Sequence, residues 1–521
     1  MSKSKSVFEK YPFDPRMIPG ETQEIAVVSG SWRDMGRQYA QQCREGFLAR
    51  AADLKGAYLD FYGNRAAIEE MAHRYTRAAD KEFPQLIELF EGMAEGAGVT
   101  LTEAIIVFYG KSMMRAEQEC SHVAAWGEAT DNGHLLGAGN MDLEYDAREY
   151  LPAVLAFPED GNAFIASELF HRACLNEKGL LLQGSGGQNA GENDLIRPDG
   201  QDLRHMWNDV NLYAIAYCST AAEAVEAYQR WKYVAGCNQF FGDKSHDCYM
   251  MEFTASRCAV RRAGDYGERS YLIQNNGYIA EEMQGSLMTH ERYWTDCLPR
   301  YWTVQKVVED HWGGITLDIL NKAQGSYRYY IPEGWSFAYR EDWGVNYWYN
   351  DDREPFPSGW HEDWDPAHMV WSTQSKSISF KAVVRHLVDV DTLTCYLMKG
   401  ESDPVLSCNP GTLGTYWNIR LGGGPLDIVK RARKELEYQL WRAARDIIRG
   451  DASREKAEPH LNKAKACMYE GINCQALAVC STELDNPDET MMLYGRALTA
   501  FCKGQCHARL AQKDPGAIET D

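Results

Sequence analysis

The hydrophobic pattern of this 521-residue chain changes its period at one point, and that change constrains the fold more than any other feature. From residue 35 to residue 117, apolar side chains recur at helical spacing in three stretches, 35–62, 66–95 and 101–117. From Cys120 onward they alternate with polar ones, and turns with Asn or Asp close to Gly follow at 131–133, 159–162 and 176–179. Helices followed by successive hairpins predict an α+β fold with antiparallel sheets.

The rest of the chain divides in the same way into blocks of strands and blocks of helices. A short strand is expected at 24–28, and helices at 221–231 and 288–324. Strands are expected at 238–242, 248–253, 259–262 and 271–274, with a final pair within 374–399. From Gly422 onward, Leu436, Leu440, Ala443 and Ile447 form a helical stripe. We therefore expect a mainly helical segment over 1–119, a catalytic domain over 120–420 and a helical extension over 421–521.

Composition excludes two classes of partner. The chain carries 75 Asp and Glu against 54 Lys and Arg, a net charge of −21. Nucleic acids and anionic membrane surfaces both require a basic face, so neither is expected as a partner. No apolar run is long enough for a membrane span or a secretory signal, which favours a cytoplasmic protein. The odd number of cysteines, fifteen, fits reduced thiols.

Cys120 occupies an unusual position among these cysteines. It stands at the start of the first long strand, directly after the helical segment, in the sequence Glu119-Cys120-Ser121-His122. If the bond between Glu119 and Cys120 were cut, the new α-amine would lie beside the thiol. An α-amine has a pKa near 7.7–8.0 and could act as the general base for that thiol. Two other interpretations stay open: a buried structural thiol, and a thiol–imidazole pair with His122.

Several short motifs accompany Cys120 in a fixed order. They lie at 30–36, 91–98, 120–121, 138–142, 175–180, 238–243 with Glu252, and 274–278. In this order they resemble N-terminal-nucleophile (Ntn) hydrolases of the isopenicillin N acyltransferase type, which are related to penicillin V acylase and bile salt hydrolase. One departure is Gly139, where bile salt hydrolases carry an arginine. A guanidinium that supports the thiolate would therefore have to come from elsewhere in this chain.

The resemblance implies a fold and a set of site residues. The fold is a four-layer αββα sandwich, and the cleavage site lies between Glu119 and Cys120. Cys120 would attack a carbonyl carbon, and Asp142 would hydrogen-bond the new α-amine or the nucleophile. Asn276, or Asn275 beside it, would donate to the developing oxyanion. Further candidates for oxyanion or substrate contacts are Asn140, His122 and Gly186.

The function implied is hydrolysis of a linear, non-peptide amide through an acyl-enzyme on Cys120, with a hydrophobic or aromatic acyl group. The partners expected are a small-molecule amide, the two cleaved chains bound to each other, and further copies in a homo-oligomer. Neither a cofactor nor a metal is expected. Three alternatives stay open: transfer of the acyl group to an amine acceptor, a non-catalytic binding or assembly protein, and a lipid or N-acyl amide hydrolase similar to phospholipase B-like proteins.

Other clusters of reactive or aromatic residues have more ordinary explanations. The aromatic-rich insertion 327–371 could form a small core of its own or wall a pocket for an acyl group. The glycine-rich stretch 184–191 fits a loop beside the site rather than a phosphate loop. The histidines and aspartates of 361–368 fit a solvated loop. The cysteines of 467–506 fit helix packing better than structural zinc.

Overall fold

The structure is a computed structural model. It describes residues 25–114, 119–144, 152–185, 202–286, 291–324, 329–340, 345–361, 364–365, 370–371, 380–399, 414–424, 428 and 433–438. The predictions for Gly186, for most of the extension 421–521 and for the cysteines of 467–506 concern residues outside these ranges.

The first part of the chain is one strand followed by five helices. They are β1 (Ile25–Gly30), α2 (Trp32–Gln42), α3 (Arg44–Tyr62), α4 (Arg65–Glu82), α5 (Pro84–Ala97) and α6 (Leu101–Tyr109). Pro84 has no N–H to donate, so it opens a new helix where 66–95 was expected to be one. The helix expected over 35–62 also divides, at Cys43.

Helices α2 and α5 approach each other backbone to backbone, and glycines allow this. A Cβ atom on Gly36 would collide with the carbonyl oxygen of Leu89, and one on Gly92 would collide with that of Arg33. Gly96 faces the carbonyl of Arg37 in the same way. Gly36, Gly92 and Gly96, from the motifs 30–36 and 91–98, therefore serve the packing of two helices.

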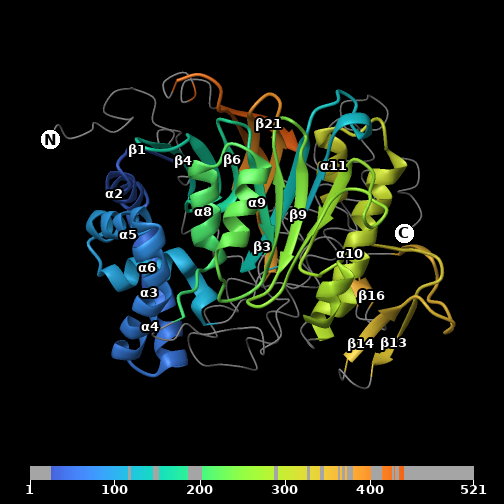
Figure 1. Ribbon diagram of the computed structural model, residues 1–521, viewed down its shortest axis with the longest axis horizontal. Coiled ribbons are helices and arrows are strands. Elements are labelled where there is room, and N and C mark those ends of the chain that lie inside the picture. The colour runs from blue at the N-terminus through green and yellow to red at the C-terminus, as the bar shows by residue number, and fades with distance from the viewer. Residues whose placement is uncertain are drawn as a thin grey trace, which may run out of the picture.

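Two large sheets form the centre of the molecule (Figure 1). One has eight strands in the order β1-β4-β5-β6-β7-β8-β9-β10, and the other has seven in the order β11-β2-β3-β18-β19-β20-β21. Only the pairing of β1 with β4 is parallel among the described strands of these sheets. The bounds of the first sheet's further strands are β4 (Ala153–Pro158), β5 (Phe164–Glu168), β6 (Arg172–Asn176), β7 (Leu181–Ser185), β8 (Cys237–Gly242), β9 (Cys248–Phe253) and β10 (Cys258–Arg261).

The second sheet draws its strands from both halves of the chain. They are β2 (Glu119–Ala125), β3 (Leu136–Glu144), β11 (Tyr271–Gln274), β18 (Phe380–Asp389), β19 (Thr394–Lys399), β20 (Gly414–Arg420) and β21 (Arg433–Tyr438). The later helices are α8 (Trp207–Tyr217), α9 (Ala221–Arg230), α10 (Glu291–Asp310) and α11 (Leu317–Gln324). Helices combined with antiparallel sheets confirm the expected α+β class.

Three groups of buried apolar side chains show which elements pack together. The first joins α2–α6, α8 and α9 to one face of the eight-stranded sheet. The second lies between the two sheets, and the third joins the other face of the seven-stranded sheet to α10 and α11. Strand β2 contributes to two of these groups: Cys120 and Ala124 lie between the sheets, whereas Val123 and Ala125 face α10 and α11.

Helix α8 and strand β21 both differ from the expectations. Helix α8 was not predicted, because nearly all of its residues are buried and the sequence shows no polar face there. Residues 433–438 were expected to be helical but form strand β21, paired with β20. The apolar Leu436 and Tyr438 are two residues apart, which also fits a strand.

Candidate active site

Cys120 lies on β2, just beyond the point where the neighbouring edge strand β11 ends. The ladder between β11 and β2 ends at the pair Gln274 and His122, so β11 does not continue alongside Cys120. The loop after β11 takes over instead: the backbone N–H of Cys120 donates to Asn276 Oδ1 at 3.0 Å. The Cys120 residue itself is 1% exposed. The folded chain thus brings together two residues that were predicted to share a site although 156 positions separate them.

Arg300 completes this contact from helix α10. Its Nη1 donates to the carbonyl oxygen of Cys120 at 3.1 Å, and its Nη2 donates to Asn276 Oδ1 at 3.2 Å. The guanidinium is 1% exposed, so it places a buried positive charge beside the Cys120 backbone. Asn276 Oδ1 accepts from both Cys120 and Arg300, which fixes the plane of its amide.

Arg300 was not among the predicted site residues, although the sequence carried a signal for it. The resemblance, in which Gly139 stands where bile salt hydrolases carry an arginine, had predicted a guanidinium from another segment. In the sequence, Arg300 follows Leu298 and Pro299 and precedes Tyr301 and Trp302. A single charged residue within an apolar stretch of a helix is often buried against a partner.

Asn275 has a different set of partners from its neighbour. Its Nδ2 donates to the carbonyl oxygen of Cys297 at 2.5 Å, and its Oδ1 accepts from the N–H of Gly277 at 2.7 Å. Asn238, on β8, donates from one Nδ2 to the carbonyl oxygens of Asn275 and Gly277, both at 2.8 Å. These contacts shape the loop that carries Asn276.

His122 lies on the same face of β2 as Cys120, and its side chain extends to the eight-stranded sheet. Its Nε2 is 3.2 Å from the carbonyl oxygen of Gly184, at the end of β7. Its ring stacks with that of His386 on β18 at a centroid distance of 5.4 Å. Complete burial lowers the pKa of His122 to about 3, so the imidazole is neutral near pH 7.

The remaining predicted residues fall in three places. Asn140 is fully buried and pairs with Ser121, which puts both on the face of the sheet opposite Cys120. The backbone of Asp142 pairs with Glu119, one step from Cys120, while its side chain lies outside the described part of the structure. Glu119 and Cys120 are consecutive residues of β2.

The aromatic insertion forms a core with helix α10. Its short two-stranded sheets pair β12 (Tyr329–Ile331) with β15 (Gly359–His361), β13 (Ser336–Arg340) with β14 (Val345–Tyr349), and β16 (Trp364–Asp365) with β17 (Val370–Trp371). Trp348 is 1% exposed, and Trp335 packs on Trp302 of α10 at 4.5 Å between ring centroids. These side chains belong to the apolar group that faces α10, whereas Cys120 belongs to the group between the sheets. The described part therefore fits the small-core interpretation.

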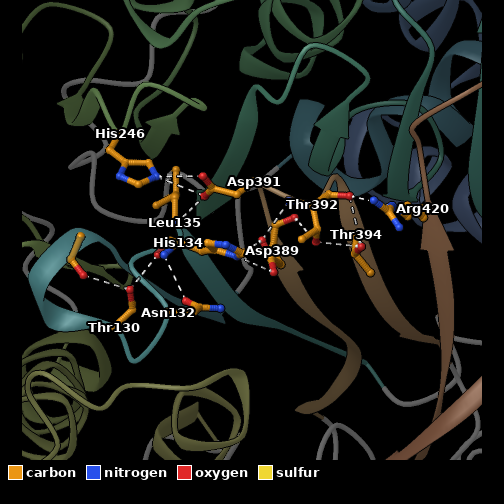
Figure 2. A network of polar contacts seen from close by, with 11 residues as sticks. Thr130, Asn132, His134, Leu135, His246, Asp389, Asp391, Thr392, Thr394 and Arg420 are labelled. Carbon is orange, nitrogen blue, oxygen red and sulfur yellow. Dashed lines mark hydrogen bonds and ion pairs between the residues drawn. The ribbon is translucent and has the colours of Figure 1, made fainter.

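A cluster of histidines and aspartates joins three turns at the opposite end of β2 (Figure 2). His134 Nδ1 lies 3.0 Å from Asp389 Oδ2, and His246 Nε2 lies 3.1 Å from Asp391 Oδ2. Asp391 also accepts from the N–H of Leu135 at 2.7 Å. One possible ligand atom from each of His134, Asp389 and Asp391 lies within 4.8 Å of the others. The carboxylates of Asp389 and Asp391 already accept hydrogen bonds from backbone N–H groups. We therefore interpret the cluster as polar contacts that hold the turns together.

The comparisons with known proteins give structural likeness only. No protein-family model and no curated protein matches the chain. Among the described residues, no helix combines the length and apolar character that crossing a membrane requires. The chain is similar to penicillin V acylase from Agrobacterium tumefaciens, with 11% identity and a TM-score of 0.32 over 61% of this chain and 99% of that one. Two variants of conjugated bile acid hydrolase from Clostridium perfringens are similar at 11% identity, with TM-scores of 0.33 and 0.30, over 61% of this chain and 98% of each of theirs.

Proposed function

We propose that this chain is a cysteine amidohydrolase of the Ntn type, with the αββα arrangement of layers that its three apolar groups support. The observation that carries the proposal is the contact of Cys120, Asn276 and Arg300. Cys120 stands at the start of a strand. Its backbone N–H donates to the side-chain oxygen of Asn276, and its carbonyl oxygen accepts from the buried guanidinium of Arg300. Cys120 is the proposed nucleophile, and Arg300, which contacts the carbonyl oxygen of Cys120, is proposed as the guanidinium expected from another segment.

The first reaction would be cleavage of the chain itself. The Cys120 thiol attacks the carbonyl carbon of Glu119, the C–N bond between the two residues breaks, and a thioester forms. The peptide nitrogen takes up the thiol proton and becomes the α-amine of Cys120. Water then hydrolyses the thioester, which frees the thiol and leaves a carboxylate on Glu119. Asp142, whose backbone pairs with Glu119, is proposed to hydrogen-bond the new amine.

The second reaction would be hydrolysis of a small-molecule amide. The α-amine takes the thiol proton, and the sulfur attacks the amide carbon of the substrate. The developing oxyanion accepts a hydrogen bond from Asn276 Nδ2, because Asn276 Oδ1 is already turned toward Cys120 and Arg300. The amine product leaves with the proton, and water releases the acid from the thioester. Asn275 is less suited to this role because its side chain holds the loop.

The mass of the purified protein tests self-cleavage. Pieces of roughly 14 and 46 kDa are expected, in proportion to chain length on either side of the Glu119–Cys120 bond. Cys120→Ala should remain a single chain and lose all amidase activity. An active enzyme whose chain stays intact would refute the α-amine as base, and amidase activity in Cys120→Ala would refute the nucleophile.

Substrate panels separate this function from its alternatives. Amides of increasing acyl chain length distinguish a small-molecule amidase from a lipid amide hydrolase. An added amine acceptor that captures the acyl group would indicate a transferase. An intact Glu119–Cys120 bond, together with a Cys120 thiol that does not react with iodoacetamide, would instead indicate a binding or assembly protein.

A further inference from the structure

We propose that a buried ion-pair network, formed by Glu252, Arg261 and Glu268, positions the loop that carries Asn276. This inference rests on the proposed function, because it assigns the network a role in holding a catalytic amide. Arg261, on β10, is 3% exposed. It donates from Nε to Glu252 Oε1 at 2.9 Å and from Nη1 to Glu268 Oε2 at 2.5 Å.

The network forms hydrogen bonds with the backbone where the loop begins. Ile273 is the penultimate residue of β11, three positions before Asn276. Its carbonyl oxygen accepts from Arg261 Nη2 at 2.7 Å, and its N–H donates to Glu268 Oε1 at 3.2 Å. The N–H and the carbonyl group of Ile273 are therefore both hydrogen-bonded to the network, through Glu268 and Arg261 respectively.

The same network forms hydrogen bonds with the backbone where the loop ends. Glu252 Oε2 accepts from the N–H groups of Ile279 and Ala280, both at 2.9 Å. Glu252 is the carboxylate whose other oxygen binds Arg261. One guanidinium and its two carboxylates thus connect residues 273 and 279, and Asn276 lies midway between them.

The network also reaches helix α10, which carries Arg300. The hydroxyl of Tyr301 donates to Glu268 Oε1 at 3.0 Å. Glu268 therefore binds both the start of the loop and the residue next to Arg300. A shift of the network would move the two groups that contact Cys120, which are Asn276 and Arg300, relative to each other.

The charges in the network favour positioning over simple stabilisation. Two carboxylates face one guanidinium, so one negative charge depends on N–H and O–H donors from the loop and from α10. If the loop moved away, it would leave a buried carboxylate without those donors, at a high cost. Apolar side chains of similar size can often replace a buried ion pair without loss of stability, but they would not fix hydrogen-bonded backbone groups in one position.

The test is a double-mutant cycle between Arg261 and Asn276, measured on the processed enzyme with an amide substrate. Arg261→Lys keeps the charge but loses the three-way contact, and we expect kcat to fall by roughly 10- to 100-fold with little change in KM. In an Asn276→Ala background, Arg261→Lys should lower kcat by less than about threefold, because the side chain that Arg261 positions is then absent. Equal losses in both backgrounds would overturn the inference.

A second variant covers the case in which Arg261→Lys does not fold. The triple substitution Glu252→Gln, Arg261→Met and Glu268→Gln leaves no buried charge unpaired, so it should remain folded, as thermal unfolding would show. A folded triple variant with wild-type kcat would refute the positioning role. Arg385 is the matched control, because it is also fully buried and binds the carbonyl oxygens of Asn321 and Gln324. Arg385→Lys should show no coupling to Asn276→Ala.

The outcomes also separate this inference from the proposed function. If Cys120→Ala and Asn276→Ala both retain full amidase activity, the proposed function fails, whatever the network does. If those two variants are inactive or slow, and the losses caused by Arg261→Lys are simply additive with Asn276→Ala, the proposed function stands and the positioning role fails.

Discussion

Arg300 brings a positive charge to the point where the Cys120 carbonyl and the Asn276 amide meet. Its planar guanidinium donates to both acceptors at once, which a lysine ammonium on a flexible stem does not reproduce. We expect Arg300→Lys to lower kcat by about 10²-fold, the loss typical of a misplaced catalytic group, because the Asn276 amide would lose a donor that fixes it. Steady-state kinetics on an amide substrate would measure this.

The control for Arg300→Lys is Arg385→Lys. Arg385 is equally buried, but its guanidinium binds Asn321 and Gln324, so its loss should lower stability and leave kcat close to wild type. Equal losses of kcat in the two variants would mean that Arg300 acts only through the stability of the fold.

His122 makes stability sensitive to acid. Burial lowers its folded-state pKa to about 3, whereas an unfolded histidine titrates near 6.5. Between these values the unfolded chain binds the proton and the folded chain does not, so stability should fall as pH drops below 6.5. The slope from this residue reaches up to about 1.4 kcal/mol per pH unit.

Urea unfolding at pH 4.5, 5.5 and 7 would measure the contribution of His122. In His122→Gln, the free energy of unfolding should depend less on pH than in wild type. His73 is exposed on α4, so His73→Gln should retain the wild-type dependence. An unchanged pH dependence in His122→Gln would contradict the prediction.

Among the residues of the site, sequence patterns could reach some but not others. Cys120 was found because the hydrophobic period changes beside it, which is a local signal. Asn276 was named from a short motif, and its contact with Cys120 depends on the end of the β11 ladder. Arg300 was missed because its apolar neighbours indicate a buried charge but not that its partner lies 180 positions away.

At the scale of elements, the close crossing of α2 and α5 depends on glycine. Gly92→Ala would drive its Cβ into the carbonyl group of Arg33, so the helices would have to move apart. We expect a loss of at least about 1–3 kcal/mol in the free energy of unfolding, as for overpacked cores. Chemical denaturation would measure it.

Gly56 provides the matched control within the neighbouring helix. It lies in α3, and a Cβ placed there would meet nothing within 4 Å. Gly56→Ala should therefore be neutral or stabilise by up to about 1 kcal/mol, because alanine favours helices. Equal destabilisation in the two variants would show that the α2–α5 crossing does not require glycine.

The elements themselves show which patterns a sequence reveals. Strands β9 and β11 match their expected bounds, because each has turn residues on both sides. Helix α8 has no polar face, and β21 contains only Leu436 of the apolar stripe that predicted a helix there. Both were missed or misassigned because burial on all sides, or a short ambiguous spacing, removes the periodic signal.

For the whole molecule, the cut proposed at Glu119–Cys120 would divide the sequence but not the fold. Strand β1 pairs in parallel with β4 along its full length, across the cleavage point. Trp32 Nε1 donates to Asp160 Oδ1 at 3.0 Å, and Tyr109 donates to the buried Asp209 at 2.8 Å. The helices before the cut also share one apolar core with α8 and α9.

We therefore expect the two pieces to remain bound after cleavage. Size-exclusion chromatography in native buffer should give one peak that contains both pieces and elutes with the uncleaved Cys120→Ala chain, whether as a monomer or as a homo-oligomer. In concentrated urea the pieces should separate, because the β1–β4 pairing and the shared core are then lost. Elution of the smaller piece by itself in native buffer would contradict this prediction and would mean that the sheet stays stable without its β1 edge strand.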